Sequence, residues 1–267
     1  METFFSRLER RADECASLLC VGLDPHPQLL PHPTAAAARE FCLRLIEKTA
    51  PYAAAFKPNA AFFEAFGAPG WEALAAVIAA ARATGASVIL DAKRGDIAST
   101  ARAYAQSAFE HLGAHAITLN PYLGYDAVEP FIGDPEKGAF LLCKTSNPGS
   151  ADLQDLMVDD GVLLYEHVAR LAQGWNAAGN IGLVVGATQP EALARVRTAA
   201  PGLWFLSPGV GAQGGDLETA LRSGLRADGR GLLINVSRGI ARAENPRQAA
   251  AALRDEILRL QGEINAH

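Results

Sequence analysis

The chain has 267 residues, of which 49% are hydrophobic and 20% are charged, so it is expected to fold around a sizeable core. Its formal net charge of −5 and its lack of a basic block argue against nucleic acid as a partner, and no segment approaches the ~18 consecutive apolar residues that cross a membrane. The four cysteines match no metal or redox spacing and the first residues do not resemble a signal peptide, which predicts reduced thiols and a cytoplasmic location.

Short apolar segments recur along the whole chain, and each ends in small or polar residues. They lack the strict apolar–polar alternation of a sheet with one exposed face, so they are expected to be strands buried on both faces, as in a parallel sheet. Eight segments of this kind occur, at residues 17–24, 53–59, 87–93, 116–122, 139–146, 181–188, 203–210 and 231–238.

Helical patterns lie between these segments. Thr34 is a candidate N-cap for the first, which stops before Pro51. The expected helices span residues 34–50, 70–85, 97–113, 161–179, 190–200, 215–224 and 245–264. Eight strand–helix alternations favour a single (β/α)8 TIM barrel of the α/β class over residues 1–267, with a doubly wound open sheet as the alternative. Residues 147–161 are the longest segment expected to be irregular, and they could form a lid.

Polar side chains of both signs follow the predicted strands, and in such barrels the active site lies at this end. Asp91 and Lys93 are two residues apart on an extended chain, so their side chains are expected to point the same way. Asp96 follows at a helix start, where an N-cap is the simpler role. The groups at the strand ends are Asp24, Lys57, Asp91, Lys93, Asn120, Lys144, Ser146, Thr188, Gln213 and Arg238.

Two glycine-rich or small-residue segments, SPGVGAQGGD (207–216) and NVSRGI (235–240), follow the seventh and eighth strands. This is the recurrent phosphate site of (β/α)8 barrels, and Arg238 could bind phosphate oxygens in a bidentate manner. No metal site is expected, because no histidine falls at a strand end beside the carboxylates. Surface or helix-packing positions are predicted for His26, His32, His111, His115, His167 and His267.

The order of these motifs resembles the orotidine 5′-phosphate decarboxylases. The resemblance runs from GLD (22–24) to SRG (237–239), and its most specific element is D-x-K-x-x-D-I at Asp91, Lys93, Asp96 and Ile97, followed by Thr100. TSNPG (145–149) and PGVGAQGG (208–215) are similar to the longer bacterial branch of that family. One position departs from many relatives, since Ser237 stands where they have glycine, although a backbone N–H remains available there.

The resemblance implies a cofactor-free conversion of orotidine 5′-monophosphate to uridine 5′-monophosphate, the last step of pyrimidine nucleotide synthesis, by a homodimer with shared sites. It implies that Lys93 protonates C6 of the pyrimidine and that Asp91 holds Lys93 in place. The remaining implied roles are partner-site contacts for Asp96, Ile97 and Thr100, ribose contacts for Asp24 and Lys57, pyrimidine contacts for Ser146 and Pro208, and phosphate contacts for Gln213 and Arg238.

The chemistry of that reaction suits these residue types. Loss of carbon dioxide leaves an electron pair in the ring plane at C6, which a desolvated ammonium can stabilise and then protonate. Flanking carboxylates favour the charged form of such a lysine. Two alternatives stay open: a metal-dependent decarboxylase of a phosphorylated keto-sugar acid, whose relatives carry a metal-binding Glu where this chain has Lys57, and a non-catalytic barrel that binds a phosphorylated ligand.

Overall fold

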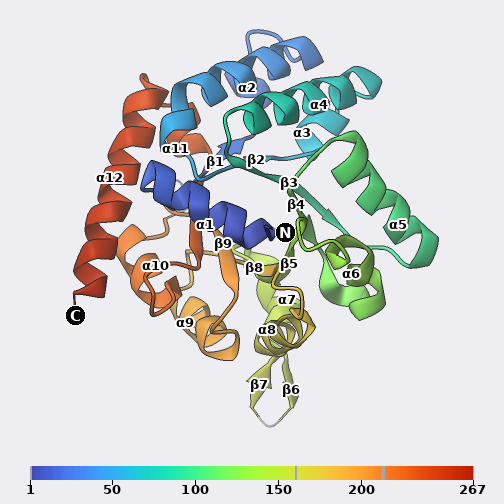
Figure 1. The fold of residues 1–267 in the computed structure, drawn as a ribbon, viewed down its shortest axis with the longest axis vertical. Coiled ribbons are helices and arrows are strands. Elements are labelled where there is room, and N and C mark those ends of the chain that lie inside the picture. The colour runs from blue at the N-terminus through green and yellow to red at the C-terminus, as the bar shows by residue number, and fades with distance from the viewer. Residues whose placement is uncertain (1, 160, 212–213, 267) are drawn as a thin grey trace.

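Eight parallel strands form a closed barrel in the computed structural model, which describes residues 2–159, 161–211 and 214–266 (Figure 1). The order around the barrel is β1-β10-β9-β8-β5-β4-β3-β2. All eight predicted strands are therefore confirmed, and the open-sheet alternative is wrong. The strands are β1 (Leu19–Leu23), β2 (Ala55–Pro58), β3 (Ser87–Arg94), β4 (Ala116–Leu119), β5 (Gly138–Lys144), β8 (Ile181–Val185), β9 (Trp204–Pro208) and β10 (Leu232–Val236).

Helices surround the barrel on its outer face, as Figure 1 shows. The Thr34 hydroxyl accepts a hydrogen bond from the backbone N–H of Ala37 at 3.2 Å, which confirms this residue as an N-cap. The longer helices are α2 (Ala35–Thr49), α4 (Ala68–Ala83), α5 (Ala98–Gln106), α6 (Tyr125–Ile132), α8 (Leu164–Trp175), α9 (Pro190–Ala199), α10 (Leu217–Gly224) and α12 (Pro246–Asn265), and the short ones include α3 (Ala61–Glu64) and α11 (Arg238–Ala241). No helix among the described residues is long and apolar enough to span a membrane.

Two predicted helices have different bounds in the structure. The helix expected over 97–113 is α5 followed by a π-helical turn at Ser107–His111. The helix expected from residue 161 starts only at Leu164, because a short strand precedes it. The sequence also gave no sign of α6, which carries Pro130 in its interior and is only eight residues long.

The amino-terminal helix α1 (Phe4–Cys15) lies across the end of the barrel opposite the carboxyl ends of the strands (Figure 1). Its fully buried Phe4 ring packs edge-on against Phe140 of β5, with 6.0 Å between ring centroids. Phe5 stacks on Trp204 of β9 at 6.1 Å. Gly138 permits this packing, because a Cβ there would collide with the Phe4 ring. The amphipathic start of the chain therefore closes one end of the barrel with aromatic side chains.

The segment expected to be the longest irregular loop is ordered into short elements, so that prediction is wrong. It contains a 3-10 turn at Pro148–Ser150, α7 (Ala151–Gln154) and an antiparallel hairpin of β6 (Met157–Asp159) with β7 (Val162–Leu163). In Figure 1 the hairpin projects away from the barrel beside α8. Whether the segment moves as a lid stays a prediction.

Candidate active site

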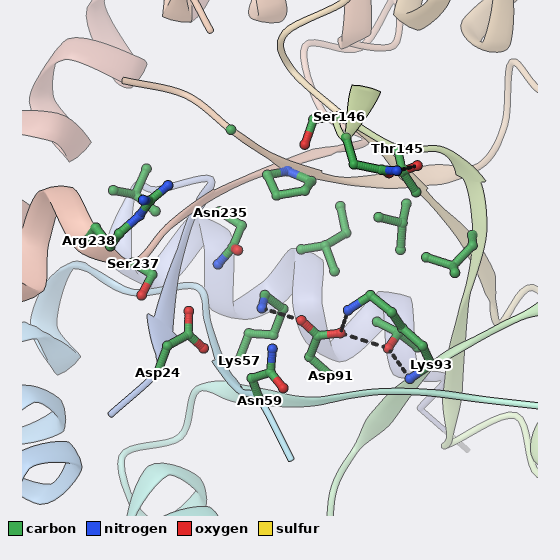
Figure 2. Close-up of a pocket in the computed structure, with 18 of the residues that line it drawn as sticks. Asp24, Lys57, Asn59, Asp91, Lys93, Thr145, Ser146, Asn235, Ser237 and Arg238 are labelled. Atoms are coloured by element: carbon green, nitrogen blue, oxygen red, sulfur yellow. Dashed lines mark hydrogen bonds and ion pairs between the residues drawn. The ribbon is translucent and has the colours of Figure 1, made fainter. Parts of the chain in front are cut away.

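A cavity of about 640 Å³ opens at the carboxyl ends of the strands. Its walls come from seven of the eight barrel strands and from the loops at the carboxyl ends of the strands, so residues distant in sequence meet there (Figure 2). The structure brings seven of the predicted site residues to this cavity: Asp24, Lys57, Asp91, Lys93, Ser146, Pro208 and Arg238.

A carboxylate between two ammonium groups forms the floor of the cavity. Lys57 Nζ on β2 lies 2.8 Å from Asp91 Oδ2, and Lys93 Nζ lies 2.5 Å from Asp91 Oδ1 (Figure 2). The Lys57 and Asp91 side chains are 6% and 10% exposed, whereas that of Lys93 is 47% exposed. The buried Lys57–Asp91 pair is thus held in place, and Lys93 carries the ammonium that a ligand can reach.

Asp91 and Lys57 remain charged despite their burial, because each favours the charged form of the other. Burial alone would raise the pKa of Asp91, but the ammonium groups of Lys57 and Lys93 outweigh it and hold that pKa well below its usual range. Burial would likewise lower the pKa of Lys57, yet Asp91 and then Asp24 more than offset it and raise that pKa. Asp91 is therefore a carboxylate and Lys57 an ammonium at neutral pH.

The end of β3 departs from regular strand geometry at the point where this group is built. The register against β4 shifts between Leu90 and Arg94, and Lys93 has a left-handed φ of 49°. Asp91 and Lys93 do meet, but through this turn of the backbone and not through the alternation of an extended chain, so the geometric reason given for their meeting is wrong. A lysine in this region of φ is strained, and such strain concentrates at functional sites.

Thr118 of β4 fixes the irregular backbone, and sequence reasoning missed it. Its hydroxyl donates to Asp91 Oδ1 at 3.0 Å and accepts from the backbone N–H groups of Ala92 and Lys93, each at 3.0 Å. One buried hydroxyl thereby orients both the carboxylate and the strand end that carries Lys93. Its position two residues before Asn120, at the end of a predicted strand, was the only available signal.

Asp24, Ser237 and Arg238 lie together at the other end of the cavity from Lys93 (Figure 2). Asp24 Oδ1 and Ser237 Oγ are buried and have no hydrogen-bond partner among the described residues. Gly22 makes room for this arrangement, because a Cβ there would lie 2.6 Å from Ser237 Cβ. The cavity therefore has a cationic end at Arg238, buried oxygens suited to hydroxyl groups next to it, and the ammonium groups beyond.

The wall opposite Lys93 is formed by the segment that follows β5 (Figure 2). The Thr145 N–H donates to Gln154 Oε1 at 2.9 Å, and Gln154 Nε2 donates to the Thr145 hydroxyl at 2.9 Å. Sequence reasoning found Ser146 here but missed several polar neighbours, because their contacts depend on how the segment folds back. The missed lining residues of this segment are Thr145, Asn147 and Gln154, whereas Asn59 after β2 and Asn235 of β10 were missed elsewhere in the cavity.

Three predicted site residues lie outside this cavity. Asp96 accepts a hydrogen bond from the Ile97 N–H at 2.8 Å, and Ile97 is itself the extended N-cap residue of α5, so the N-cap alternative for Asp96 is wrong. Ile97 is 54% exposed, and Thr100 borders a separate cavity with Tyr104. Gln213 lies outside the described residues.

One further expectation about the strand ends needs correction. Lys144 does not line this cavity, because its side chain lies behind the wall and pairs with Asp155. His26 lines the cavity and packs edge-on against Phe62 of α3, which agrees with the helix-packing role that was one of the two expected for it. Among the described residues, no group of three or more His, Cys, Asp or Glu side chains could hold a metal ion.

The sequence and the fold both match known proteins over nearly their whole length. A family model described as orotidine 5′-phosphate decarboxylase / HUMPS family matches residues 17–253. The orotidine 5′-phosphate decarboxylase of Roseiflexus castenholzii is 51% identical over 267 residues, covering 98% of this chain and 97% of that protein. The structure of Leishmania donovani OMP decarboxylase superposes on this one with a TM-score of 0.90 at 60% identity, covering 97% of this chain and 99% of the other. A Toxoplasma gondii structure described as an orotidine-monophosphate decarboxylase superposes with a TM-score of 0.95 at 47% identity, covering 99% of this chain and 98% of the other. The chain therefore belongs to the orotidine 5′-phosphate decarboxylase / HUMPS family.

Proposed function

We propose that this protein decarboxylates orotidine 5′-monophosphate to uridine 5′-monophosphate, without a cofactor, and that Lys93 delivers the proton to C6. The observation that carries the proposal is the half-exposed Lys93 ammonium, held 2.5 Å from a buried carboxylate on the floor of a cavity of about 640 Å³. Family membership and curated relatives at about half identity support the same activity.

The chemistry follows from the charges on that floor. Breaking the bond between C6 and its carboxyl group leaves the electron pair on C6 and releases carbon dioxide. The pair lies in the ring plane, where the pyrimidine π-system cannot delocalise it, so an ammonium facing C6 stabilises the transition state. Lys93 then transfers a proton from Nζ to C6 and regains one from solvent, to which its side chain is open.

Asp91 holds the Lys93 side chain in place. Because the pKa of Asp91 is well below its usual range, the group remains a carboxylate and holds the ammonium through a charge-assisted hydrogen bond. Lys57 on the other oxygen and the Thr118 hydroxyl prevent the carboxylate from turning away. Lys93 is thus oriented before the substrate arrives, which reduces the reorganisation required during the reaction.

The rest of the cavity orients the nucleotide. Arg238 and the backbone at Ser237 hold the phosphate, with Gln213 as the further predicted contact. Asp24 and Lys57 bind the ribose hydroxyls. The buried Asp24 Oδ1, which has no hydrogen-bond partner in the described part of the chain, suits a hydroxyl donor. Ser146, which lies above Lys57 and Asp91 in Figure 2, contacts the pyrimidine, and so does Pro208, which lines the same cavity.

A homodimer with shared sites accounts for the remaining predicted residues. Asp96, Ile97 and Thr100 lie outside their own cavity, at the end of β3 next to the end of β4. Large apolar side chains are exposed in the segments that follow β3 and β4, which favours their burial against a second copy of the chain. These side chains are Ile97, Tyr122, Leu123 and Tyr125. In the dimer, Asp96 of one protomer adds a second carboxylate near Lys93 of its partner.

The four cysteines support a cytoplasmic location. All four are buried free thiols in the structure, as expected for a protein that works in a reducing compartment. Burial raises the pKa of Cys20 to about 12, so its thiol is unreactive beneath the site.

A spectrophotometric assay with and without chelator tests the activity. The absorbance of orotidine 5′-monophosphate is expected to fall at the same rate in both conditions, and Lys93→Ala is expected to keep the fold and abolish turnover. Chelator-sensitive turnover would favour the metal-dependent class, and binding without turnover would favour a non-catalytic barrel. Near-full activity of Lys93→Ala would remove this lysine from the mechanism.

A further inference from the structure

A buried ammonium lies directly behind the cavity wall, outside the site described above. Lys144 is the last residue of β5, and its side chain is only 2% exposed. Its Nζ lies 2.6 Å from Asp155 Oδ1 and 3.3 Å from Ser150 Oγ, and 5.6 Å from the centre of the Tyr165 ring. Among the described residues, Asp155 is the only carboxylate within ion-pair distance of this ammonium.

An irregularity in β5 sends this side chain behind the wall. Leu142 lines the substrate cavity, and in a regular strand Lys144, two residues later, would face the same way. The register of β5 against β8 shifts between these two residues, and Lys144 borders the neighbouring cavity instead. The strand end thereby keeps a third ammonium out of the cavity that holds Lys57 and Lys93.

Among the described residues, both hydrogen-bonding partners of the Lys144 ammonium belong to the segment that forms the cavity wall. That segment leaves the barrel at Thr145 and returns at Asp155, so the ion pair joins its two ends. The hydrogen bonds between Thr145 and Gln154 lie just inside this closure, and both side chains line the substrate cavity. A buried ammonium needs a carboxylate partner, and this requirement ties the returning end of the segment to the end of β5.

We propose that Lys144 is a positioning residue for the decarboxylase site. Its ion pair with Asp155 and its hydrogen bond to Ser150 hold the wall segment, residues 145–155, where Thr145 and Ser146 face the pyrimidine of the substrate. The assignment of the pyrimidine to this wall rests on the proposed function; the restraint of the segment itself does not.

Three variants test the restraint: Lys144→Met, Asp155→Asn and the double variant. Lys48→Met is the matched control, because Lys48 is exposed on α2, on a different part of the barrel. Hydrogen exchange measured by mass spectrometry is expected to accelerate in peptides covering the wall segment for all three variants, and to stay unchanged elsewhere and in the control. This readout needs no substrate, so it is independent of whether the proposed activity is correct.

Kinetics and ligand binding then test positioning. Displacement of the wall is expected to lower kcat/KM by on the order of a hundredfold in each single variant. Binding of uridine 5′-monophosphate is expected to weaken, whereas binding of ribose 5-phosphate, which lacks the base, stays as in the original protein. Because the two side chains act through one contact, the double variant should lose no more than the worse single variant.

The outcomes separate the possible errors. Unchanged exchange of the wall segment, or losses that multiply in the double variant, would overturn the role of Lys144. Equal weakening of both ligands would show a general structural effect and would also overturn it. If Lys144→Met does not fold, Asp155→Asn at the half-exposed side of the pair decides the matter. If the unmodified protein does not turn over the substrate, the proposed function fails and the exchange data still judge the restraint.

Discussion

Replacing Lys57 by methionine removes the most buried cation of the site and keeps most of its apolar stem. Asp91 then retains Lys93, at 2.5 Å, and the Thr118 hydroxyl, at 3.0 Å, but it loses its buried partner at 2.8 Å. Breaking a buried ion pair costs about 3–5 kcal/mol, and the two remaining contacts put this case at the lower end, about 3 kcal/mol. With an unfolding entropy of about 2.1 cal/mol/K per residue, 267 residues give roughly 0.56 kcal/mol/K, so Tm falls by about 5 °C.

The pH dependence of this loss follows from the direction of the Lys57 shift. Asp91 and Asp24 raise the pKa of Lys57 in the folded protein against the effect of burial, so its stabilisation is complete below the ordinary value of 10.5 and falls as pH rises toward the folded value. At pH 11, above the ordinary pKa of a lysine, part of that stabilisation is already lost, and the difference between the original protein and Lys57→Met should be smaller than at pH 7.

Urea unfolding at pH 7 and pH 11, followed by circular dichroism, measures both quantities. Lys48→Met serves as the control for the same chemical change on the surface, where an effect within about 0.5 kcal/mol is expected. A loss below about 1 kcal/mol at pH 7 would show that the pair contributes little net stability. A difference that grows between pH 7 and pH 11 would contradict the raised pKa.

Three other predictions concern the site, the dimer and the barrel end. Arg238→Met should raise the KM for the nucleotide by about 10- to 150-fold while leaving the affinity for orotidine unchanged, as inhibition assays would reveal, because a charged hydrogen bond to phosphate contributes about 1.5–3 kcal/mol. Mixed Lys93→Ala and Asp96→Ala chains should regain about a quarter of native activity, since half of the dimers then carry one intact site of two; no recovery despite subunit exchange would mean self-contained sites. Arg197→Lys should lower stability by about 3 kcal/mol in urea unfolding with little change in kcat, because the partly buried guanidinium stacks 3.7 Å from the Phe205 ring centre and several carbonyls would lose their donor. These carbonyls belong to Ala200, Pro201, Leu203, Gly224 and Gly231.

The barrel was predictable because its strands are buried on both faces. A continuous apolar run such as residues 181–185 is typical of a strand that is covered on both sides. Apart from α1, which was not among the expected helices, the elements that were missed are short and lack such a pattern. Helix α6 has a proline in its interior, and the β6–β7 hairpin is an exposed excursion whose Met157 is 72% exposed. Local pattern identifies what the core requires, and it says little about segments that the core does not constrain.

The residues of the candidate site were likewise predictable only where a local sequence pattern marked them. Asp91 and Lys93 could be found because they are close in the sequence and lie at the end of a predicted strand. Thr118 could not, because its bond to Asp91 joins residues 27 positions apart and exists only once β3 and β4 are paired. The position of Lys144 could not be predicted either, because the register shift that turns it out of the cavity leaves no mark in the residue pattern.

The left-handed backbone at Lys93 helps to build the site but lowers the stability of the folded protein. Glycine adopts a φ of 49° without strain, so Lys93→Gly is expected to relieve a penalty of about 1 kcal/mol even as it removes the ammonium from the cavity. Because Lys93 is the proposed proton donor, a laboratory selection for heat resistance alone is expected to favour an inactive protein at this position. Attempts to raise the thermal stability of the enzyme therefore have to measure turnover as well.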